Sequence, residues 1–295
     1  MDQKTIYALG FFDGVHLGHQ ALLSKCRELA EKHRCYAGAV TFSVHPATLV
    51  SADAPPLLNA NHDRKSLLRN FGMRRILHLS FNQELRNTHW ADFLNQLLDR
   101  GAAGFVCGDD FRFGAGGHGT TEKLAAFCEE RHLPYAIVPE QVMDGKRISS
   151  TRIRKLLEQG QVAQANRLLG HHHILSGKIL PGKQLGRKLG FPTANMALPA
   201  GVLTPKWGVY ICKASIDGVI YSALTNIGCR PTVNGNGILA ETHLLDFDQD
   251  LYEQDMTLAF CEFLRPEIKF DSLEALQAEI QKNVLQTRNF FQKSE

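Results

Sequence analysis

The sequence lacks several features that mark membrane, secreted and zinc-binding proteins. No apolar stretch approaches the length that a membrane span requires, and the N-terminus, Met1–Lys4, lacks the long apolar run of a signal peptide. The seven cysteines are odd in number, scattered and never spaced as Cys-x-x-Cys, which favours reduced thiols over disulfides or a structural zinc site. We therefore expect a cytoplasmic protein without a membrane partner.

A strong charge of either sign is also missing. The chain has 33 Lys and Arg against 30 Asp and Glu, and this net charge of +3 is too small for a general nucleic-acid binder. We therefore expect small-molecule partners and no nucleic acid, and the sequence does not predict self-association. The length of 295 residues favours two domains, and a hydrophobic content of 44% is normal for a globular protein.

The first half of the chain alternates between strand-like and helical segments. This alternation predicts an α/β domain with a doubly wound parallel sheet, in which ligands bind beyond the carboxyl ends of the strands. The predicted strands are residues 5–12, 35–42, 75–80, 104–108 and 135–138, and the predicted helices are 20–33, 64–71, 90–100 and 122–131.

The pattern changes after the histidines at 171–173, which have no nearby carboxylate or cysteine and are interpreted as a linker or strand start. Residues 149–169 predict two short helices broken at Gly160. Asp217-Gly218 is a strong hairpin signal, and Ser272 is positioned to cap a closing helix over 272–292. We predict an antiparallel β-barrel with a C-terminal helix, and domains over 1–170 and 171–295. The predicted strands are 174–180, 208–216, 219–227, 241–247 and 256–263.

The first motif lies in residues 9–20, Leu-Gly-Phe-Phe-Asp-Gly-Val-His-Leu-Gly-His-Gln. It predicts a strand, a tight turn and a helix start, where glycines let a ligand approach the backbone and free N–H groups attract an anion. His16 and His19 are three residues apart and face one side of a helical turn. The motif favours a phosphate-rich ligand, although one histidine could simply cap the helix. The candidate binding residues around the histidines are Gly10, Phe12, Gly14 and Gly18.

The second motif is Lys-Arg-Ile-Ser-Ser-Thr-Arg-Ile-Arg over residues 146–154. Hydroxyl groups start a helix among basic residues, so Arg147, Ser150, Thr151 and Arg154 could clamp a triphosphate. Alone, the stretch fits an ordinary capped helix with a solvated basic face. Together, His-Leu-Gly-His and Ile-Ser-Ser-Thr-x-x-Arg resemble the two-part signature of nucleotidyltransferases, which implies that His16, His19 and Arg154 serve catalysis.

Two stretches between these motifs resemble the flavin side of FAD synthetase domains. They are Thr41-Phe42 with His45-Pro46, and residues 108–114, Gly-Asp-Asp-Phe-Arg-Phe-Gly. The resemblance implies that Phe42, His45 and Phe113 lie near the isoalloxazine and Asp110 near the nucleotide. Without the resemblance, the aromatic residues could equally belong to the core, and Asp110 could be a helix cap. Ser43-Val44 stand where that family often has an acidic residue and a proline.

The second half has a dense motif at residues 186–195, Gly-Arg-Lys-Leu-Gly-Phe-Pro-Thr-Ala-Asn. Its glycines and cations suit a loop that covers phosphates, and Thr193 and Asn195 offer the hard oxygen ligands that Mg²⁺ prefers. The string resembles the hallmark of riboflavin kinases. The resemblance implies that nucleotide and metal contacts come from Gly186, Arg187, Gly190, Phe191, Thr193 and Asn195.

Further stretches resemble the same kinases in order, at residues 208–210, 226–232 and 241–247. Glu241 stands at the position of the kinases' catalytic carboxylate, which implies that it accepts the proton of the riboflavin 5′-hydroxyl. Taken alone, it is an exposed strand carboxylate. Glu253 departs from the pattern, since a glycine usually follows the tyrosine there.

The resemblance extends from about residue 5 to about residue 290, and the chain is identified as a member of the bifunctional riboflavin kinase/FMN adenylyltransferase family (prokaryotic FAD synthetases). It implies that the second domain makes FMN from riboflavin and ATP, and that the first makes FAD and pyrophosphate from FMN and ATP. Both steps would need Mg²⁺. The alternatives are a nucleotidyltransferase with another acceptor and a non-catalytic protein that binds flavin or nucleotide.

Overall fold

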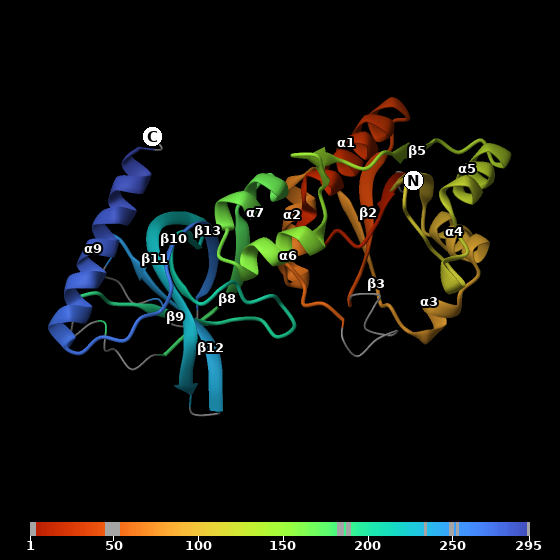
Figure 1. The fold of residues 1–295 in the computed structure, drawn as a ribbon. Helices are drawn as coiled ribbons and strands as arrows, with labels where there is room; N and C mark the ends of the chain where they lie inside the picture. The colour runs from red at the N-terminus through yellow and green to blue at the C-terminus, as the bar shows by residue number, and fades with distance from the viewer. Residues whose placement is uncertain are drawn as a thin grey trace. The chain divides into compact units, whose positions relative to one another are not determined.

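The computed structural model describes residues 4–44, 54–181, 186, 190–232, 235–247, 251 and 254–293, without the side chains of 230–236. The chain divides into two compact units (Figure 1). The first consists of Met1–Leu57 with Asn61–Ser150, and the second of Leu58–Ala60 with Thr151–Glu295. Three residues of the N-terminal half therefore belong to the C-terminal unit.

The first unit is built on a five-stranded sheet of order β3-β2-β1-β4-β5, in which every neighbouring pair is parallel. The chain winds outward from β1 in both directions, so the predicted doubly wound sheet is confirmed. The order reverses between β1 and β4, and ligands bind at such switch points. The strands are β1 (Thr5–Leu9), β2 (Tyr36–Phe42), β3 (Arg75–Leu79), β4 (Ala102–Gly108) and β5 (Tyr135–Val138).

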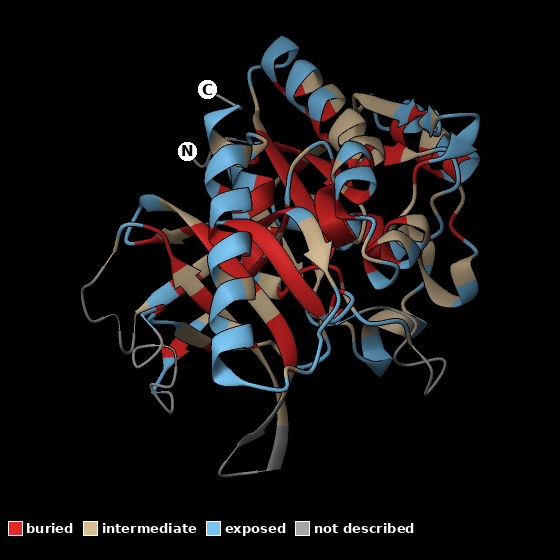
Figure 2. Cartoon of the chain, turned by 60° about the vertical axis from the view of Figure 1, so that its left-hand side comes forward, coloured by how far each residue is buried: buried red, intermediate tan, exposed pale blue. Residues whose placement is uncertain are grey.

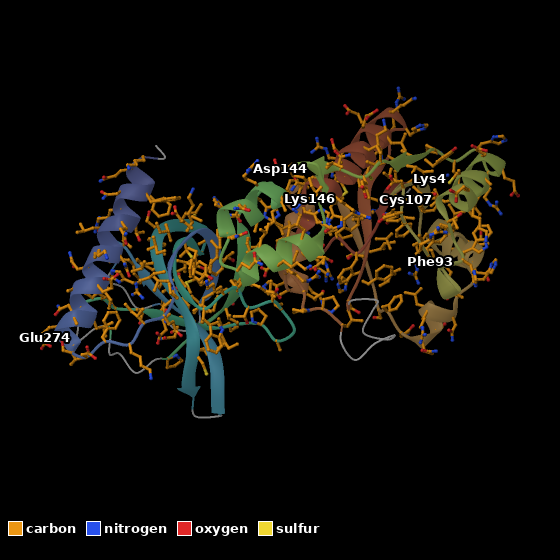
Figure 3. The ribbon with its side chains drawn as sticks, viewed as in Figure 1. Lys4, Phe93, Cys107, Asp144, Lys146 and Glu274 are labelled. Carbon is orange, nitrogen blue, oxygen red and sulfur yellow. The ribbon has the colours of Figure 1, made fainter. Side chains whose placement is uncertain are left out.

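The central strand β1 is buried along its whole length, because helices cover both faces of the sheet. One face packs against α4 and α5 in a cluster that includes Phe93 and Cys107, both labelled in Figure 3. The Cys26 thiol of α1 donates to the carbonyls of Ile6 and Gly38. The helices are α1 (Leu17–Lys32), α2 (Asn61–Asn70), α3 (Gln83–Asn87), α4 (Trp90–Asp99) and α5 (Thr121–Glu130), with 3-10 turns at η1 (Asp13–Val15) and η3 (Ala115–Gly117) and a hairpin of β6 (Val142–Met143) and β7 (Lys146–Arg147).

Two helices follow, α6 (Ser150–Glu158) and α7 (Val162–Leu169), and the predicted break lies at Gly160, whose φ of 78° is left-handed. They lead into a closed six-stranded barrel of order β10-β11-β12-β9-β8-β13, antiparallel throughout. The predicted antiparallel barrel is confirmed. Its strands are β8 (His173–Leu180), β9 (Ala194–Ala197), β10 (Gly208–Ile216), β11 (Val219–Thr232), β12 (Gly235–Leu244) and β13 (Asp255–Arg265).

The closing helix α9 (Leu273–Gln292) begins at Ser272, whose hydroxyl accepts the Ala275 N–H at 3.1 Å. Its inner face packs Val284 and Ile280 against barrel residues such as Phe191, while much of its outer face is exposed (Figure 2). Within the described residues, no helix combines the length and the apolar character needed to cross a membrane.

Candidate active sites

The first motif forms the predicted strand, turn and helix start at the carboxyl end of β1. Phe12 and Gly14 take left-handed conformations, with φ of 59° and 80°, and reverse the chain between β1 and α1. His16 then caps α1, because its Nδ1 accepts the His19 N–H at 3.3 Å. The two imidazole rings stack with centroids 3.7 Å apart. The histidines thus share one side of the turn, and His16 also has the capping role that the sequence left open.

Small residues make room for these rings. A Cβ atom on Gly18 would lie 3.2 Å from the His16 ring, and one on Gly10 would lie 3.1 Å from the Phe12 ring. Phe12 is buried, and its ring meets the His19 ring edge-on at 5.3 Å. A larger residue at either glycine would press on the aromatic and imidazole rings that form the turn.

His19 is held in its neutral form. Burial lowers the pKa of His19 well below its ordinary value, and the nearby charges of His16 and Arg64 lower it further. Its Nδ1 atom is buried and has no hydrogen-bond partner among the described residues. A neutral imidazole offers one N–H donor and one acceptor to a ligand.

Arg64 is a buried cation at the same end of the sheet, and sequence reasoning did not single it out. Its Nη2 donates to the Phe42 carbonyl at 2.5 Å and to Asn61 Oδ1 at 2.6 Å. Its guanidinium lies over the Phe11 ring, 4.3 Å from the centroid. Burial lowers the pKa of Arg64 to about 10 despite the opposing charge of Asp13, so the group stays charged at pH 7.

One sequence signal could have found Arg64. It shares the buried face of α2 with Leu67 and Leu68. Side chains three and four positions apart lie on one face of a helix, so a cation in this pattern interrupts an apolar stripe. A charged side chain on a buried helix face indicates a specific structural or binding role.

The second motif begins next to the first. The Ser150 hydroxyl donates to the Asp13 carbonyl at 2.9 Å, which joins the start of α6 to the turn after β1 within the first unit. Thr151 and Arg154 follow in α6, where Thr151 is exposed and Arg154 is buried. The structure therefore brings Ser150 to the histidine turn across more than a hundred residues of sequence.

Two further candidates meet at the exposed edge of the sheet. Arg147 of β7 forms an ion pair with Asp110, which follows β4, and its Nε lies 3.1 Å from Glu140 Oε2. The Asp110 carboxylate raises the pKa of Arg147. Asp110, the predicted nucleotide contact, and Arg147, one of the predicted phosphate-binding residues, therefore form an ion pair with each other.

The flavin-side candidates are spread over the unit. Phe42 is half-buried at the end of β2, edge-on to Phe81 at 5.4 Å. Phe113 is buried in the core, where its ring centroid is 6.0 Å from Phe93 and 5.6 Å from Phe111.

Three positions that the sequence analysis named lie outside the described residues, namely His45, Arg187 and Glu253.

The barrel unit holds a cavity of about 660 Å³. Its wall includes four residues that the sequence singled out, and it also includes polar groups that the sequence did not assign. The predicted residues are Gly186, Phe191, Thr193 and Glu241, and the unassigned polar ones include Asn226, His243, Arg265 and Glu267.

The barrel register sets Glu241 between two amides. Glu241 of β12 pairs with Asn226 of β11 on one side and with Asn195 of β9 on the other. Side chains of directly opposed residues share one face of a sheet. A carboxylate, two amides and the Thr193 hydroxyl are therefore gathered at one part of the barrel.

The approach to this cluster requires glycine. A Cβ atom on Gly186 would overlap the Phe191 carbonyl, and the Phe191 N–H donates to the Gly186 carbonyl at 2.8 Å. Gly190 is left-handed, with φ of 83°. The backbones of Gly186 and Phe191 therefore lie close together, and both residues line the cavity with Thr193.

A second carboxylate lies near the first. The Asn226 amide donates to Glu267 Oε1 at 3.1 Å, and a Cβ atom on Gly228 would overlap the Glu267 carboxylate. The sequence analysis assigned no role to Glu267.

Helix α9 is bound to the cavity wall by a polar network. Arg265 Nε donates to Asn283 Oδ1 at 2.9 Å and lies 3.4 Å from Glu279 Oε1. The Asn283 amide donates to that same Glu279 oxygen at 3.1 Å. Asn283 is only 2% exposed, while Arg265 and Glu279 are half-buried, so the network is a partly buried junction between β13 and α9.

The histidines at 171–173 mark a strand start, as one interpretation predicted. β8 begins at His173, which is buried and packs against Phe260 with ring centroids 5.7 Å apart. Burial lowers the pKa of His173 to about 3, so this imidazole is neutral in the folded protein.

The first unit is a doubly wound sheet with paired histidines at a helix start. The second is a barrel whose cavity gathers a carboxylate with amide and hydroxyl oxygens. Together these sites define a two-domain enzyme that uses nucleotides. The FAD synthetase family model matches residues 1–152, and the riboflavin kinase model matches residues 169–291. The chain belongs to the family of bifunctional riboflavin kinases/FMN adenylyltransferases.

Relatives match along the whole chain. The bifunctional riboflavin kinase/FMN adenylyltransferase of Pseudomonas fluorescens is 36% identical over 96% of this chain and 92% of its own. That of Escherichia coli K12 is 34% identical over 98% and 93%. A crystal structure from Streptococcus pneumoniae, described as a macrolide-efflux protein, is 28% identical with a TM-score of 0.87, covering 98% of this chain and 95% of that one. The fold is thus shared over both domains.

Proposed function

We propose that the two domains act in turn on one flavin, with the residues gathered at each site carrying the chemistry. The barrel domain transfers the γ-phosphoryl group of ATP to the riboflavin 5′-hydroxyl, giving FMN and ADP. The first domain transfers AMP from a second ATP to FMN, giving FAD and pyrophosphate. The match of both family models, each to its own half of the chain, carries this conclusion.

In the kinase step, Glu241 is the proposed base. It accepts the proton of the 5′-hydroxyl as that oxygen bonds to the γ-phosphorus, while the bond from that phosphorus to the bridging oxygen breaks and ADP leaves. Its place in the cavity wall between Asn195 and Asn226 supports this role. A strand of a closed barrel holds such a carboxylate rigidly, which favours its alignment with the attacking hydroxyl group.

The neighbouring motif is the proposed phosphate and magnesium site. Gly186, Arg187, Gly190 and Phe191 would hold the nucleotide, since the tight fold at Gly186 leaves backbone accessible to it. The cavity wall also includes apolar Val209, Leu224 and Ile280, which suit the flavin ring.

Thr193 and Asn195 fit a magnesium ion that is bound largely by substrate. Their oxygens are hard ligands, and Mg²⁺ commonly takes one or two protein ligands together with phosphates and water. Within the described ranges, no group of three or more His, Cys, Asp or Glu could hold a metal, which suits such a sparse site. When bound, Mg²⁺ would offset the charge of the phosphates.

In the adenylyl transfer, an FMN phosphate oxygen attacks the α-phosphorus of ATP, and the bond to the β-phosphate oxygen breaks. His16 and His19 would stabilise the leaving pyrophosphate with the N-terminus of α1 and the backbone at Gly10, Gly14 and Gly18. The Ser150 contact with the Asp13 carbonyl supports a joint role for the second motif. The further proposed contacts are Phe12, Arg147, Ser150, Thr151 and Arg154 for the nucleotide, Asp110 beside it, and Phe42, His45 and Phe113 for the flavin.

Purified protein incubated with riboflavin, ATP and Mg²⁺ tests the two activities together. Separation of the flavins over time should show FMN rising first and FAD replacing it. FMN alone, with no FAD even from supplied FMN and ATP, would assign another acceptor to the first domain. No FMN and no FAD would leave a protein that only binds flavin or nucleotide.

The remaining proposals concern the setting of the enzyme. The described cysteines occur as thiols rather than disulfides, which supports a cytoplasmic location. A net charge of +3 fits small-molecule partners without nucleic acid. The riboflavin kinase model begins at residue 169, which supports functional domains over 1–170 and 171–295, whereas the compact units divide between Ser150 and Thr151. Residues 1–170 alone should then fold and adenylylate supplied FMN.

A further inference from the structure

Arg64 is a buried cation that uses only part of its hydrogen-bonding capacity. Its exposed fraction is 0%. Both of its hydrogen bonds to protein come from Nη2, while Nε and Nη1 are buried with no partner in the part of the chain that the structure describes. A buried charge with unpaired donors is costly, so proteins rarely keep one without a partner or a ligand.

The guanidinium is held rigidly at the ligand-binding end of the sheet. The carbonyl that accepts from Nη2 belongs to Phe42, the last residue of β2, and Asn61 is the first residue of α2. The Phe11 ring supports the planar group from one side. Because these three contacts fix the plane, the unpaired N–H donors on Nε and Nη1 have fixed directions.

A further unpaired polar atom lies at the histidine turn. His19 Nδ1 is buried with no hydrogen-bond partner among the described residues, and the charge of Arg64 is among the causes that lower the pKa of His19. Asp13 is the buried acid whose charge acts on Arg64 in the opposite direction. A cation and a neutral imidazole that each keep unpaired nitrogen atoms suit an anionic ligand better than a purely structural junction.

We propose that Arg64 binds a phosphate oxygen of a substrate of the adenylyl transfer through its Nε or Nη1 group. This proposal rests on the proposed function of the first domain. A guanidinium N–H makes a strong charge-assisted hydrogen bond to a phosphate oxygen, while Nη2 keeps its two protein acceptors. The phosphate belongs either to ATP or to FMN, and the two sources are separable by kinetics.

The test replaces Arg64 in the full chain and measures FAD synthesis. In Arg64→Gln, loss of a charge-assisted contact should raise the KM of the bound substrate about 10-fold to 100-fold. A higher KM for ATP, and for pyrophosphate in the reverse reaction with FAD, assigns the contact to ATP. A higher KM for FMN alone assigns it to the FMN phosphate. Arg69→Gln is the matched control, since Arg69 is exposed on the same helix α2.

Thermal unfolding and the circular dichroism spectrum of each variant report whether its first domain is folded, and FMN synthesis from riboflavin is the separate control for the barrel domain. Unchanged KM values for ATP, FMN and pyrophosphate in a folded Arg64→Gln would overturn the proposal. If that variant does not fold, Arg64→Lys keeps the buried charge but loses the planar group that can bond Phe42, Asn61 and a phosphate at once, and it should still raise one KM severalfold. Wild-type KM values in the lysine variant would equally overturn the proposed contact. A wild-type enzyme that makes no FAD would refute the proposed function instead.

Discussion

The rings of His16 and His19 stack with centroids 3.7 Å apart and planes inclined by 15°. The same His16 ring accepts the His19 backbone N–H, so each residue positions the other. The pair therefore acts as one unit, and replacing either histidine should disturb the site of both.

His19→Ala should abolish FAD formation and leave FMN formation unchanged. It removes a neutral imidazole from the proposed pyrophosphate site, and loss of one such stabilising group typically lowers kcat about 100-fold or more. The two products are measured separately, from FMN with ATP and from riboflavin with ATP. His33→Ala is the control, because His33 is exposed at the other end of α1. Equal loss of both activities in His19→Ala would contradict separate sites.

His16→Ala should reduce FAD formation and also lower stability. The replacement removes the N-cap of α1, and a lost cap costs about 1 kcal/mol. Thermal unfolding should show a lower midpoint for His16→Ala, together with weakened adenylyl transfer. An unchanged midpoint would show that the capping bond contributes nothing to the stability of the unit.

Glu241→Gln should stop FMN formation while FAD formation from supplied FMN continues. The amide keeps the shape of the side chain but cannot accept the hydroxyl proton, so kcat should fall about 100-fold to 10,000-fold. Glu262→Gln provides a matched control on an exposed site of β13. Normal kinase turnover in Glu241→Gln would rule out this base.

Asn283→Leu should weaken riboflavin binding more than it slows turnover. The change removes the acceptor of Arg265 and the donor to Glu279, which loosens α9 along the cavity. We expect a severalfold higher KM for riboflavin, an unfolding free energy lower by about 1–3 kcal/mol, and unchanged adenylyl transfer. Asn289→Leu, at an exposed site of α9, is the control. A variant with wild-type KM would show that the junction serves stability alone.

The buried His173 should make the enzyme less stable in mild acid. Its pKa is about 3 in the folded protein and about 6.5 when unfolded. Below pH 6.5 the unfolded chain therefore binds a proton that the folded chain does not, and the unfolding free energy falls by up to about 1.4 kcal/mol per pH unit. Urea unfolding at pH 7, 6 and 5 should show a shallower decline in His173→Leu than in the wild type. Parallel declines would contradict this contribution.

Local signals in the sequence predicted much of the fold. Asp217-Gly218 forms its hairpin because both residues adopt left-handed conformations, with φ of 47° and 80°, as a tight two-residue turn between twisted strands requires. Ser272 and Gly160 likewise mark helix ends through their own chemistry. The short strand β9 escaped prediction, because four residues that overlap the end of the 186–195 motif carry no periodic pattern and form a strand only by pairing with β12 and β8.

The candidate sites were predictable where a motif is contiguous. Residues 10–19 fold locally, so their geometry follows from their order. The pattern of α2 places Arg64 on the apolar face of that helix, but its contact with the Phe42 carbonyl depends on how α2 packs, which one helix's sequence does not reveal. The Arg265–Asn283 junction joins β13 to α9 through side chains whose direction only the assembled barrel fixes.

The segment Leu58–Ala60 lies in the N-terminal half of the sequence but belongs to the barrel unit. Leu58 is buried, and the Asn59 amide donates to the Ile174 carbonyl at 3.2 Å. A single genetic crossover near residue 150 would therefore graft three foreign residues into the kinase half of a chimera. The two activities are chemically independent, yet the sequence segments that encode them are not freely interchangeable. Functional hybrids between relatives should favour parents whose sequences match around residues 58–60 and 174.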